Sequence, residues 1–404
     1  MKNRIFAMLF AGIFLLLTGC ESQPQYSNEN TYVAGQDFQY QFYKAIGTNM
    51  GPSSIAESED GYYFITDSGF LYYASKDTME AVVLCNRPDC LHNQETDEEK
   101  RQECNAYFSG SGTLFFTDGS LYIPYDKSGY NPSDASTASG QLAKVSADGT
   151  SRETIFDLYS EKCLRFHRGN LYYLDSPNEE EGGEGNMALF RRALKKDSKP
   201  EQLARFQTAE APEITLYGNN AYVWLNTSIL RVDLTNGKEN TIVESSGDGW
   251  CMLIGFHQDK LVYKLADNGE SHYYLSQLDG SDAAVLSEMD RRNFLQADDQ
   301  YFYDIDVDFW SPNAKPEEER SVRVLQEDGT LVSEFPIGED GSLLSMAPDD
   351  YIFKVKMDEE DAWQVDCAKK SGIETGQIEW KTVLYEKMHR NGIIGKELCA
   401  SIEK

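Results

Sequence analysis

A short turn followed by an aromatic-rich strand recurs seven times in this chain of 404 residues, and this repeat limits the fold more than any other feature. The segments "EDGYYFIT", "TDGSLYIPY" and "YGNNAYVWL" are three of its copies. The strands that follow these turns start 40 to 59 residues apart, at Tyr62, Leu121, Leu171, Ala221, Leu261, Tyr301 and Tyr351. Self-similarity at this spacing predicts one supersecondary unit per repeat, with the units packed against one another.

A second hairpin follows the first in every repeat. Its turns are rich in Asn-Gly and Asp-Gly pairs, which supply the positive φ angles that tight two-residue hairpins require. The seven turns are Lys76-Asp77, Asp148-Gly149, Lys196-Asp197, Asn236-Gly237, Asp279-Gly280, Asp328-Gly329 and Ser371-Gly372. Each repeat therefore contains four short antiparallel strands, and residues 213 to 245 show the pattern with almost no insertion.

Four strands cannot bury both of their faces alone, but seven such sheets can pack face to face around a central axis. We predict an all-β fold, a seven-bladed β-propeller of four-stranded antiparallel blades, over residues 36 to 385. A β-solenoid has shorter repeats, and stacked sandwiches do not repeat internally. The segment "FQYQFYKA", residues 38 to 45, is predicted to add a strand to the last blade and so to close the ring without an exposed edge.

Two of the units, "HYYLSQLDGSDAAVL" and "ILRVDLTNGKENTIV", resemble blades of a known family. They are similar to the low-density-lipoprotein-receptor-related β-propeller-like domains found in many bacterial lipoproteins. The Tyr-Trp-Thr-Asp signature of that family is only approximated here, for example by "YFITD" at residues 63 to 67. The resemblance implies a propeller fold and says little about activity.

The N-terminus has the features of an export signal. Two basic residues precede an apolar run at residues 5 to 17, which is too short to span a bilayer. The run ends in "LTGC", which resembles the lipobox of bacterial lipoproteins. In that family the chain is cut before the cysteine, whose sulfur then carries a diacylglycerol. By this resemblance, residues 1 to 19 are a lipoprotein-type signal peptide and Cys20 is lipidated. The alternative is a plain signal peptide in which Cys20 occurs by chance.

A lipid anchor predicts a protein held on the extracytoplasmic side of the cell membrane, with the membrane as one partner. Residues 20 to 35 are polar and rich in turn formers, and we interpret them as a flexible tether. Residues 386 to 404 are predicted to form a C-terminal tail. The formal net charge of −30 repels phosphate backbones, so nucleic acid is excluded as a partner.

The connections of the repeat divide unevenly between the two faces of the predicted disc. The turns between strands one and two, and between strands three and four, are short and define a tight-turn face. The connections between strands two and three define a long-loop face, with insertions at residues 126 to 140, 175 to 186 and 308 to 320. Because binding concentrates on elaborated loops of a rigid scaffold, a ligand is predicted on the long-loop face, around the axial opening.

Three cysteines and one histidine fall in the connection between the first two blades. They are Cys85, Cys90, His92 and Cys104, with the spacing C-x4-C-x-H-x11-C. A Cys3His set is a common closed ligand shell for structural zinc. The oxidising compartment outside the membrane instead favours a disulfide, such as Cys85–Cys90 or Cys90–Cys104. Either a bound metal or a disulfide would hold this loop in one conformation. A catalytic thiol is the remaining alternative.

A second candidate site consists of three aspartates along one predicted strand and two aromatic residues of the long loops. Asp304, Asp306 and Asp308 alternate along the strand and therefore share a face, where they could chelate calcium. The glycine and the terminal glutamate of an EF-hand loop are missing, which favours solvated charges instead. Trp310 and Tyr130 could offer a flat stacking surface for a sugar ring on the long-loop face.

The other cysteines and motifs indicate no chemistry. Cys163, Cys251 and Cys367 fall singly within predicted strands, where they are interpreted as small buried residues. The chain has no Gly-x-Ser-x-Gly elbow and no His-Glu-x-x-His motif. We therefore predict a membrane-anchored propeller that binds a protein or carbohydrate ligand, or serves as a scaffold, without catalysis. The alternative is an extracellular carbohydrate-active enzyme that uses acidic residues on the long-loop face.

Overall fold

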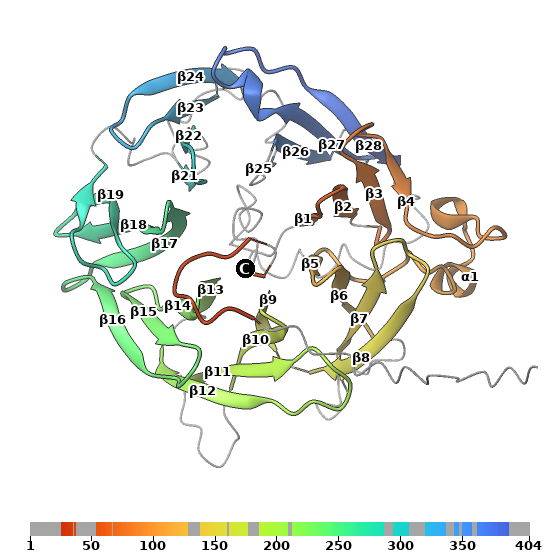
Figure 1. Cartoon of the computed structure of the whole chain (residues 1–404), viewed down its shortest axis with the longest axis horizontal. Helices are drawn as coiled ribbons and strands as arrows, with labels where there is room; N and C mark the ends of the chain where they lie inside the picture. The colour runs from red at the N-terminus through yellow and green to blue at the C-terminus, as the bar shows by residue number, and fades with distance from the viewer. Residues whose placement is uncertain are drawn as a thin grey trace, which may run out of the picture.

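The computed structural model contains seven four-stranded antiparallel sheets arranged in a ring around a central axis (Figure 1). It describes residues 26 to 387, with gaps at residues 35, 38–53, 67, 128–137, 160, 177–185, 209–211, 287–293, 307–319, 337–342, 347–349 and 358–361. In this described part, no helix is both long and apolar enough to cross a membrane. The prediction of an all-β, seven-bladed β-propeller is confirmed.

Each blade consists of four strands that are consecutive in the sequence. Blades 1 and 2 contain β1 (Ile55–Glu57), β2 (Gly61–Ile65), β3 (Leu71–Ser75), β4 (Ala81–Val83), β5 (Phe115–Thr117), β6 (Ser120–Asp126), β7 (Gly140–Ser146) and β8 (Arg152–Leu158). Blades 3 and 4 contain β9 (Lys162–His167), β10 (Asn170–Asp175), β11 (Asn186–Ala193), β12 (Glu201–Gln207), β13 (Glu213–Tyr217), β14 (Asn220–Trp224), β15 (Ser228–Asp233) and β16 (Glu239–Glu244).

Blades 5, 6 and 7 follow the same order. They contain β17 (Trp250–His257), β18 (Lys260–Asp267), β19 (Glu270–Gln277), β20 (Ala284–Val285), β21 (Phe294–Ala297), β22 (Phe302–Ile305), β23 (Ser321–Leu325), β24 (Leu331–Pro336), β25 (Leu343–Met346), β26 (Tyr351–Met357), β27 (Ala362–Lys369) and β28 (Lys381–Lys387). The short helices of the described residues lie in connections, and they are η2 (His92–Gln94), α1 (Glu98–Gln102) and η4 (Lys370–Gly372).

The turns identified in the sequence lie where they were predicted. The seven aligned residues are the first or second residue of the second strand of each blade, except that Tyr301 directly precedes it. The seven predicted second turns connect the third and fourth strands of their blades. In the β5–β6 turn, Asp118 and Gly119 have φ angles of 50° and 67°. Two successive positive φ angles give a turn whose twist matches the flanking strands, which explains the glycine in this motif.

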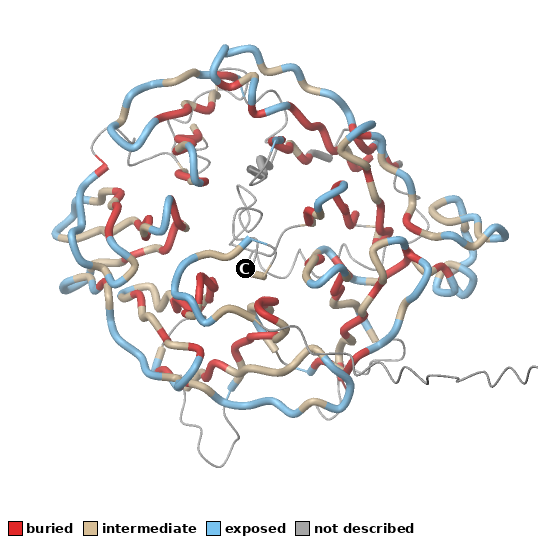
Figure 2. Tube along the Cα trace, viewed as in Figure 1, coloured by how far each residue is buried: buried red, intermediate tan, exposed pale blue. Residues whose placement is uncertain are grey.

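The hydrophobic core lies between neighbouring blades. The inner strands β2 and β22 are buried along their whole length, whereas the outer strands β16 and β20 are largely exposed (Figure 2). Aromatic rings stack across adjacent strands, as Tyr263 does on Tyr274 with 5.3 Å between the ring centroids. Large rings bury the most apolar area per side chain, so the aromatic-rich second strands stabilise the contacts between blades.

The ring closes where blade 7 meets blade 1. All four described strands of blade 7 come from residues 343 to 387, so no strand of the described chain is shared between the two blades. One hydrophobic cluster crosses this seam, and in it Tyr62 packs edge to face against Phe353 with 4.8 Å between the centroids. The predicted closing strand at residues 38 to 45 lies outside the described residues, so that role stays a prediction.

Hydrogen bonds from a buried glutamate also cross the seam. Glu386 in β28 accepts a bond from Tyr72 Oη at 2.7 Å and one from Ser68 Oγ at 2.9 Å. Burial, and then the neighbouring Glu386 carboxylate, raises the pKa of Tyr72, so the phenol stays a proton donor. Strand β28 extends to Lys387, and Glu386 therefore belongs to blade 7 rather than to the predicted C-terminal tail.

Part of the predicted tether is bound to the ring. Residues 26 to 34 and 36 to 37 run across the tight-turn face, over blades 2, 3 and 4 (Figure 1). Tyr26 Oη donates a hydrogen bond to Asp118 in the β5–β6 turn. Asn30 lies against Gly218 in the β13–β14 turn, where a Cβ atom would come within 2.2 Å of the Asn30 backbone. The described residues of the predicted tether, from Tyr26 on, are therefore docked on the ring.

Arg168 in the β9–β10 turn holds the docked segment. Its Nε and Nη2 atoms donate to the two carboxylate oxygens of Asp37 at 2.5 and 2.9 Å. Its Nη1 atom donates to the backbone oxygens of Ser27 and Glu29 at 2.5 and 3.1 Å. Both Arg168 and Asp37 are buried. A two-point, charge-assisted contact of this kind fixes position as well as adding energy.

The buried His167 beneath this segment is expected to make the fold acid-sensitive. Burial lowers the pKa of His167 from 6.5 to about 4, against the opposing effect of Asp37. Between these pH values the unfolded chain binds a proton that the folded chain does not. The free energy of unfolding should therefore fall by roughly 3 kcal/mol between pH 7 and pH 4 on account of this residue.

The test is a series of denaturant titrations across this pH range. His167→Gln can still donate to the Gly218 carbonyl oxygen, which His167 Nε2 contacts at 2.7 Å, and it should flatten the pH dependence. His272→Gln is the matched control, because the His272 side chain is 42% exposed. An unchanged slope in His167→Gln would contradict this origin of the acid sensitivity.

Candidate metal centre

The structure brings all four residues of the predicted Cys/His cluster together. The ligand atoms of Cys85, Cys90, His92 and Cys104 lie within 4.8 Å of one another. Cys104 Sγ and His92 Nδ1 are 3.8 Å apart, and the three cysteines are free thiols. A tetrahedral zinc ion with Zn–S distances of about 2.3 Å sets its sulfur ligands about 3.8 Å apart. The four residues could therefore hold such a metal with small side-chain adjustments.

Short local elements in the β4–β5 connection position these ligands. Cys85 follows β4, His92 opens η2, and Cys104 follows α1. Helix α1 begins after Asp97, whose side chain accepts hydrogen bonds from two amides of the first turn. His92 has a φ of 53°, a left-handed conformation that non-glycine residues adopt rarely. Such a conformation at a candidate ligand is consistent with a functional constraint on its position.

Two arginines fix the backbone around Cys104. Arg152 in β8 donates to the backbone oxygens of Tyr107 and Cys104 at 2.6 and 3.4 Å. Arg87, between the first two cysteines, donates to the Glu103 backbone oxygen at 2.6 Å. The second contact joins the two ends of the loop that carry the ligands. The positions of the thiols are thus set by the surrounding structure as well as by the ligands themselves.

The Cys104 thiol lies in an apolar setting that contains one favourable donor. Burial raises the pKa of Cys104, a hydrogen bond to the Cys90 side chain raises it further, and a hydrogen bond from the Ala106 amide opposes both. A metal that bound here would replace the thiol proton, and the Ala106 amide would then stabilise the thiolate. Four protein ligands leave no open coordination position, which is the pattern of structural sites rather than catalytic ones.

The second candidate site is not assembled by the described residues. Asp304 is buried in β22, and Arg323 Nη1 contacts its Oδ2 atom at 3.0 Å, so its interpretation as a solvated charge is wrong. Asp306 is half-buried, and its amide donates to Ser321. Asp308, Trp310 and Tyr130 lie outside the described residues, as does Cys20.

The three single cysteines lie within strands, and two of them are buried as predicted. Cys251 and Cys367 are buried, and Cys163 is half-buried. Burial raises the pKa of Cys251 to about 12 and that of Cys367 to about 11. Thiols with pKa values this high form little thiolate at neutral pH, so a nucleophilic role is not indicated.

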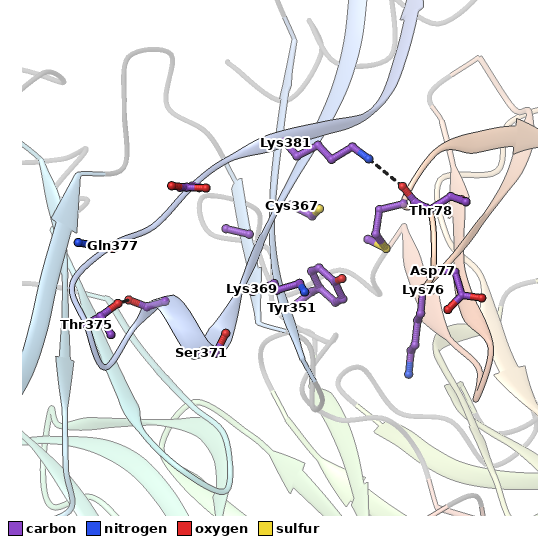
Figure 3. A pocket seen from close by; sticks show the side chains of 14 residues that line it. Lys76, Asp77, Thr78, Tyr351, Cys367, Lys369, Ser371, Thr375, Gln377 and Lys381 are labelled. Carbon is purple, nitrogen blue, oxygen red and sulfur yellow. Dashed lines mark hydrogen bonds between the residues drawn. The ribbon is translucent and has the colours of Figure 1, made fainter.

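Two clefts among the described residues were not predicted from the sequence. One of about 570 Å³ lies at the seam between blades 7 and 1, where Lys381 Nζ donates to the Thr78 backbone oxygen at 2.7 Å (Figure 3). The other, of about 550 Å³, lies on the long-loop face of blade 5, beside Trp250. A cleft forms between segments that are distant in the sequence or folded back on each other, and a lone tryptophan is too weak a signal to locate one.

Comparisons with known proteins identify the fold and no family. No family model and no curated protein matches the chain. A structure from a study of two prolyl endopeptidases matches 87% of this chain and 52% of that one, at 11% identity and a TM-score of 0.56. An oligogalacturonate lyase in complex with manganese matches 81% of this chain and 86% of that one, at 12% identity and a TM-score of 0.47. The β-propeller domain of the Trilobed protease from Pyrococcus furiosus matches 83% of this chain and 98% of that one, at 9% identity and a TM-score of 0.49. This chain spans about half the length of the prolyl endopeptidase, and at these identities the likeness concerns the propeller fold alone.

Proposed function

We propose that this chain is a lipid-anchored, extracytoplasmic propeller that binds a carbohydrate or protein ligand on its long-loop face. The "LTGC" sequence that ends at Cys20 supports the anchor. The blade motifs similar to those of receptor-related propeller domains in bacterial lipoproteins support the same location. A rigid ring with tight turns on one face and insertions on the other supports a binding role.

The docking of the N-terminal segment on one face is the observation that carries this proposal. Tyr26 is already in contact with the tight-turn face through Asp118. Cys20 precedes it by six residues, which span at most about 20 Å when fully extended. A lipid on Cys20 would therefore keep the tight-turn face close to the membrane. The long-loop face would then point towards the surroundings, where a ligand can reach it.

A carbohydrate is the ligand class that the cleft on blade 5 favours. The β16–β17 connection and the β18–β19 hairpin form its walls, which include Trp250, Asp267 and Glu270. Lys264 Nζ lies 5.8 Å from the centre of the Trp250 ring. An indole offers an apolar plane for a sugar ring, and carboxylates accept hydrogen bonds from sugar hydroxyls. The cleft thus combines the two kinds of contact that sugar binding uses.

Trp250→Ala is expected to weaken carbohydrate binding about tenfold, because one lost stacking contact is worth about 1.4 kcal/mol. The measurement is a glycan-array screen with the full-length chain, followed by calorimetric titration of the bound glycan. Tyr385→Ala is the control, since Tyr385 is a 45% exposed aromatic residue of the outer strand β28. Equal affinity in the two variants contradicts the cleft as the site. Release of a shortened glycan would instead support the enzyme alternative.

The anchor is tested by metabolic labelling with radioactive palmitate. The wild-type chain should take up the label, and Cys20→Ser should lose it. Cys163→Ser should keep the label, because this cysteine lies within β9 of the ring. A wild-type chain without label contradicts the lipid anchor and leaves the glycan test unaffected.

A further inference from the structure

The Cys/His loop is connected to the last strand of the ring through one tyrosine. Asn93 follows the candidate ligand His92, and its Nδ2 atom donates to Tyr72 Oη at 3.1 Å. Tyr72 lies in β3 of blade 1 and donates in turn to Glu386 in β28 of blade 7 at 2.7 Å. A short chain of hydrogen bonds therefore runs from the loop, through blade 1, into blade 7.

This series of hydrogen bonds reaches the seam between blades 7 and 1. Among the described residues no strand is shared between the first and last blades, so side-chain contacts across the seam contribute to the closure of the ring. Glu386 is one of these contacts and is only 4% exposed. A buried carboxylate that loses a donor is left with an unsatisfied charge, which is costly. The orientation of Tyr72 therefore matters to the closure of the ring.

Apolar burial in the loop is strongest at its two ends. Between Leu84 and Cys104, which are both buried, every residue described for exposure is half-buried or exposed. The C-terminal part pairs with blade 1, because the Leu71 amide donates to Ala106 at 2.8 Å and the Phe108 amide to Gly69 at 2.8 Å. A connection this long without a core of its own needs another source of order. Three of the four candidate ligands, Cys85, Cys90 and His92, lie in this less buried stretch.

We propose that Cys85, Cys90, His92 and Cys104 bind one Zn²⁺ ion, and that the metal-bound loop braces the seam between blades 7 and 1. Three sulfur ligands and one imidazole nitrogen suit zinc, whereas calcium takes oxygen ligands. The spread of the ligand atoms, within 4.8 Å, fits a tetrahedral ion. The ion fixes His92, which sets the position of Asn93 and hence its bond to Tyr72. Binding releases the protons of the thiols that become ligands.

The first test is the metal content of the full-length chain, purified in detergent without added metal. We expect about one zinc ion per chain by elemental analysis, and a tetrahedral thiolate spectrum after replacement of zinc by Co²⁺. His92→Ala and Cys104→Ser should lower the zinc content at least about tenfold. Cys251→Ser is the matched control, because Cys251 is a buried cysteine of blade 5 outside the cluster, and its zinc content should equal that of the wild type.

The second test asks whether the metal acts on the seam, and its first arm uses the wild-type chain alone. Removal of zinc by a chelator should speed amide hydrogen exchange in β28 by about tenfold, with little change in β15 on the far side of the ring. Asn93→Ala removes the bond to Tyr72 and leaves all four ligands in place. This variant should bind zinc normally, while exchange in β28 no longer responds to the chelator.

Each half of the proposal can fail on its own. A wild-type chain without zinc, in which thiol counting shows a disulfide between two of the three cysteines, overturns the metal site. Zinc that binds with no effect of the chelator on β28 overturns the role at the seam. A full response of β28 in Asn93→Ala would also overturn the hydrogen-bonded route, because the loop would then act through other contacts.

Discussion

Replacing Lys370 with methionine is expected to lower the free energy of unfolding by about 3 to 5 kcal/mol, the cost of breaking a buried ion pair. Lys370 Nζ lies 2.5 Å from Asp298 Oδ2, and the two side chains are only 6% and 2% exposed. Lys370 follows β27 and Asp298 follows β21, so the pair joins blade 7 to blade 6. Removing the ammonium group leaves the carboxylate buried between two blades without its counter-charge.

The hydrogen-bond partners that Asp298 keeps in Lys370→Met limit the loss of unfolding free energy. Its Oδ1 atom accepts hydrogen bonds from the amides of Gln300 and Tyr301, and its Oδ2 atom accepts one from Tyr303 Oη. These dipoles stabilise the carboxylate in part and do not neutralise it. The double variant of Lys370→Met with Asp298→Asn should therefore lose less stability than Lys370→Met alone, because no charge is left behind.

A second lysine provides a matched control for this prediction. Lys260 Nζ lies 2.6 Å from Glu327 Oε1, between blades 5 and 6, and the two side chains are 31% and 44% exposed. Water screens this pair, so Lys260→Met should change the free energy of unfolding by at most about 1 kcal/mol. Urea titrations measure the free energy of unfolding of both variants, and the comparison requires that its slope against urea concentration is unchanged. Equal losses would show that burial does not determine the strength of these pairs.

The repeat could be predicted from the sequence because its signals are local. Asp118 and Gly119 adopt the two positive φ angles that a tight hairpin needs, and no distant residue is required to explain them. Ring closure has no such signal. Tyr72 and Glu386 are 314 residues apart and touch only because seven blades complete a circle. The pairing of these two side chains follows from the curvature of the whole ring, which composition does not encode.

The N-terminal segment shows the same limit. Its polar residues are typical of a linker, and polar composition normally predicts a flexible one. Its docking depends on Arg168, more than 130 residues away from Asp37, and on glycines in the turns beneath it. Asp304 illustrates a different limit. Alternation along a strand predicts which residues share a face, but β22 is buried throughout, so no face of it is open to solvent.

The sequence predicted that the four residues of the Cys/His cluster act together, but it did not decide between a metal site and a disulfide. The spacing of Cys85, Cys90, His92 and Cys104 marks them as partners and leaves a disulfide and a metal as alternatives. Distances between the four ligand atoms are needed to favour the metal, and these depend on how η2 and α1 fold the loop. The link through Asn93 to Tyr72 could not be predicted, since neither residue belongs to a motif.

Arg168→Ala is expected to release residues 26 to 37 from the ring. The substitution leaves Asp37 buried without its guanidinium partner, which costs about 3 to 5 kcal/mol if the segment stays in place. The segment can avoid this cost by leaving the face, so that Asp37 reaches water. The loss should therefore be seen mainly as rapid proteolysis and amide exchange in residues 26 to 34, while the blades keep their protection.

Two further variants separate release of the segment from general damage to the fold. Gly218→Ala leaves the ion pair intact, but its Cβ atom would lie 2.2 Å from the Asn30 backbone, so it should release the same residues. Lys127→Ala removes an ion pair whose side chains are 36% and 33% exposed in blade 2, and it should leave the segment protected. Protection that persists in both Arg168→Ala and Gly218→Ala would contradict the docking.

If the chain is anchored through Cys20 as proposed, release of the segment should also change how the propeller is oriented on the membrane. The free chain after Cys20 would grow from six residues to seventeen, and its greatest reach from about 20 Å to about 60 Å. With the longer tether, either face of the ring could turn towards the membrane. Antibody fragments raised against the β17–β18 turn, which lies on the tight-turn face outside the docked segment, should then bind intact cells that carry Arg168→Ala, and bind poorly to cells that carry the wild type. Strong binding to the wild type would show that the tight-turn face is not held towards the membrane.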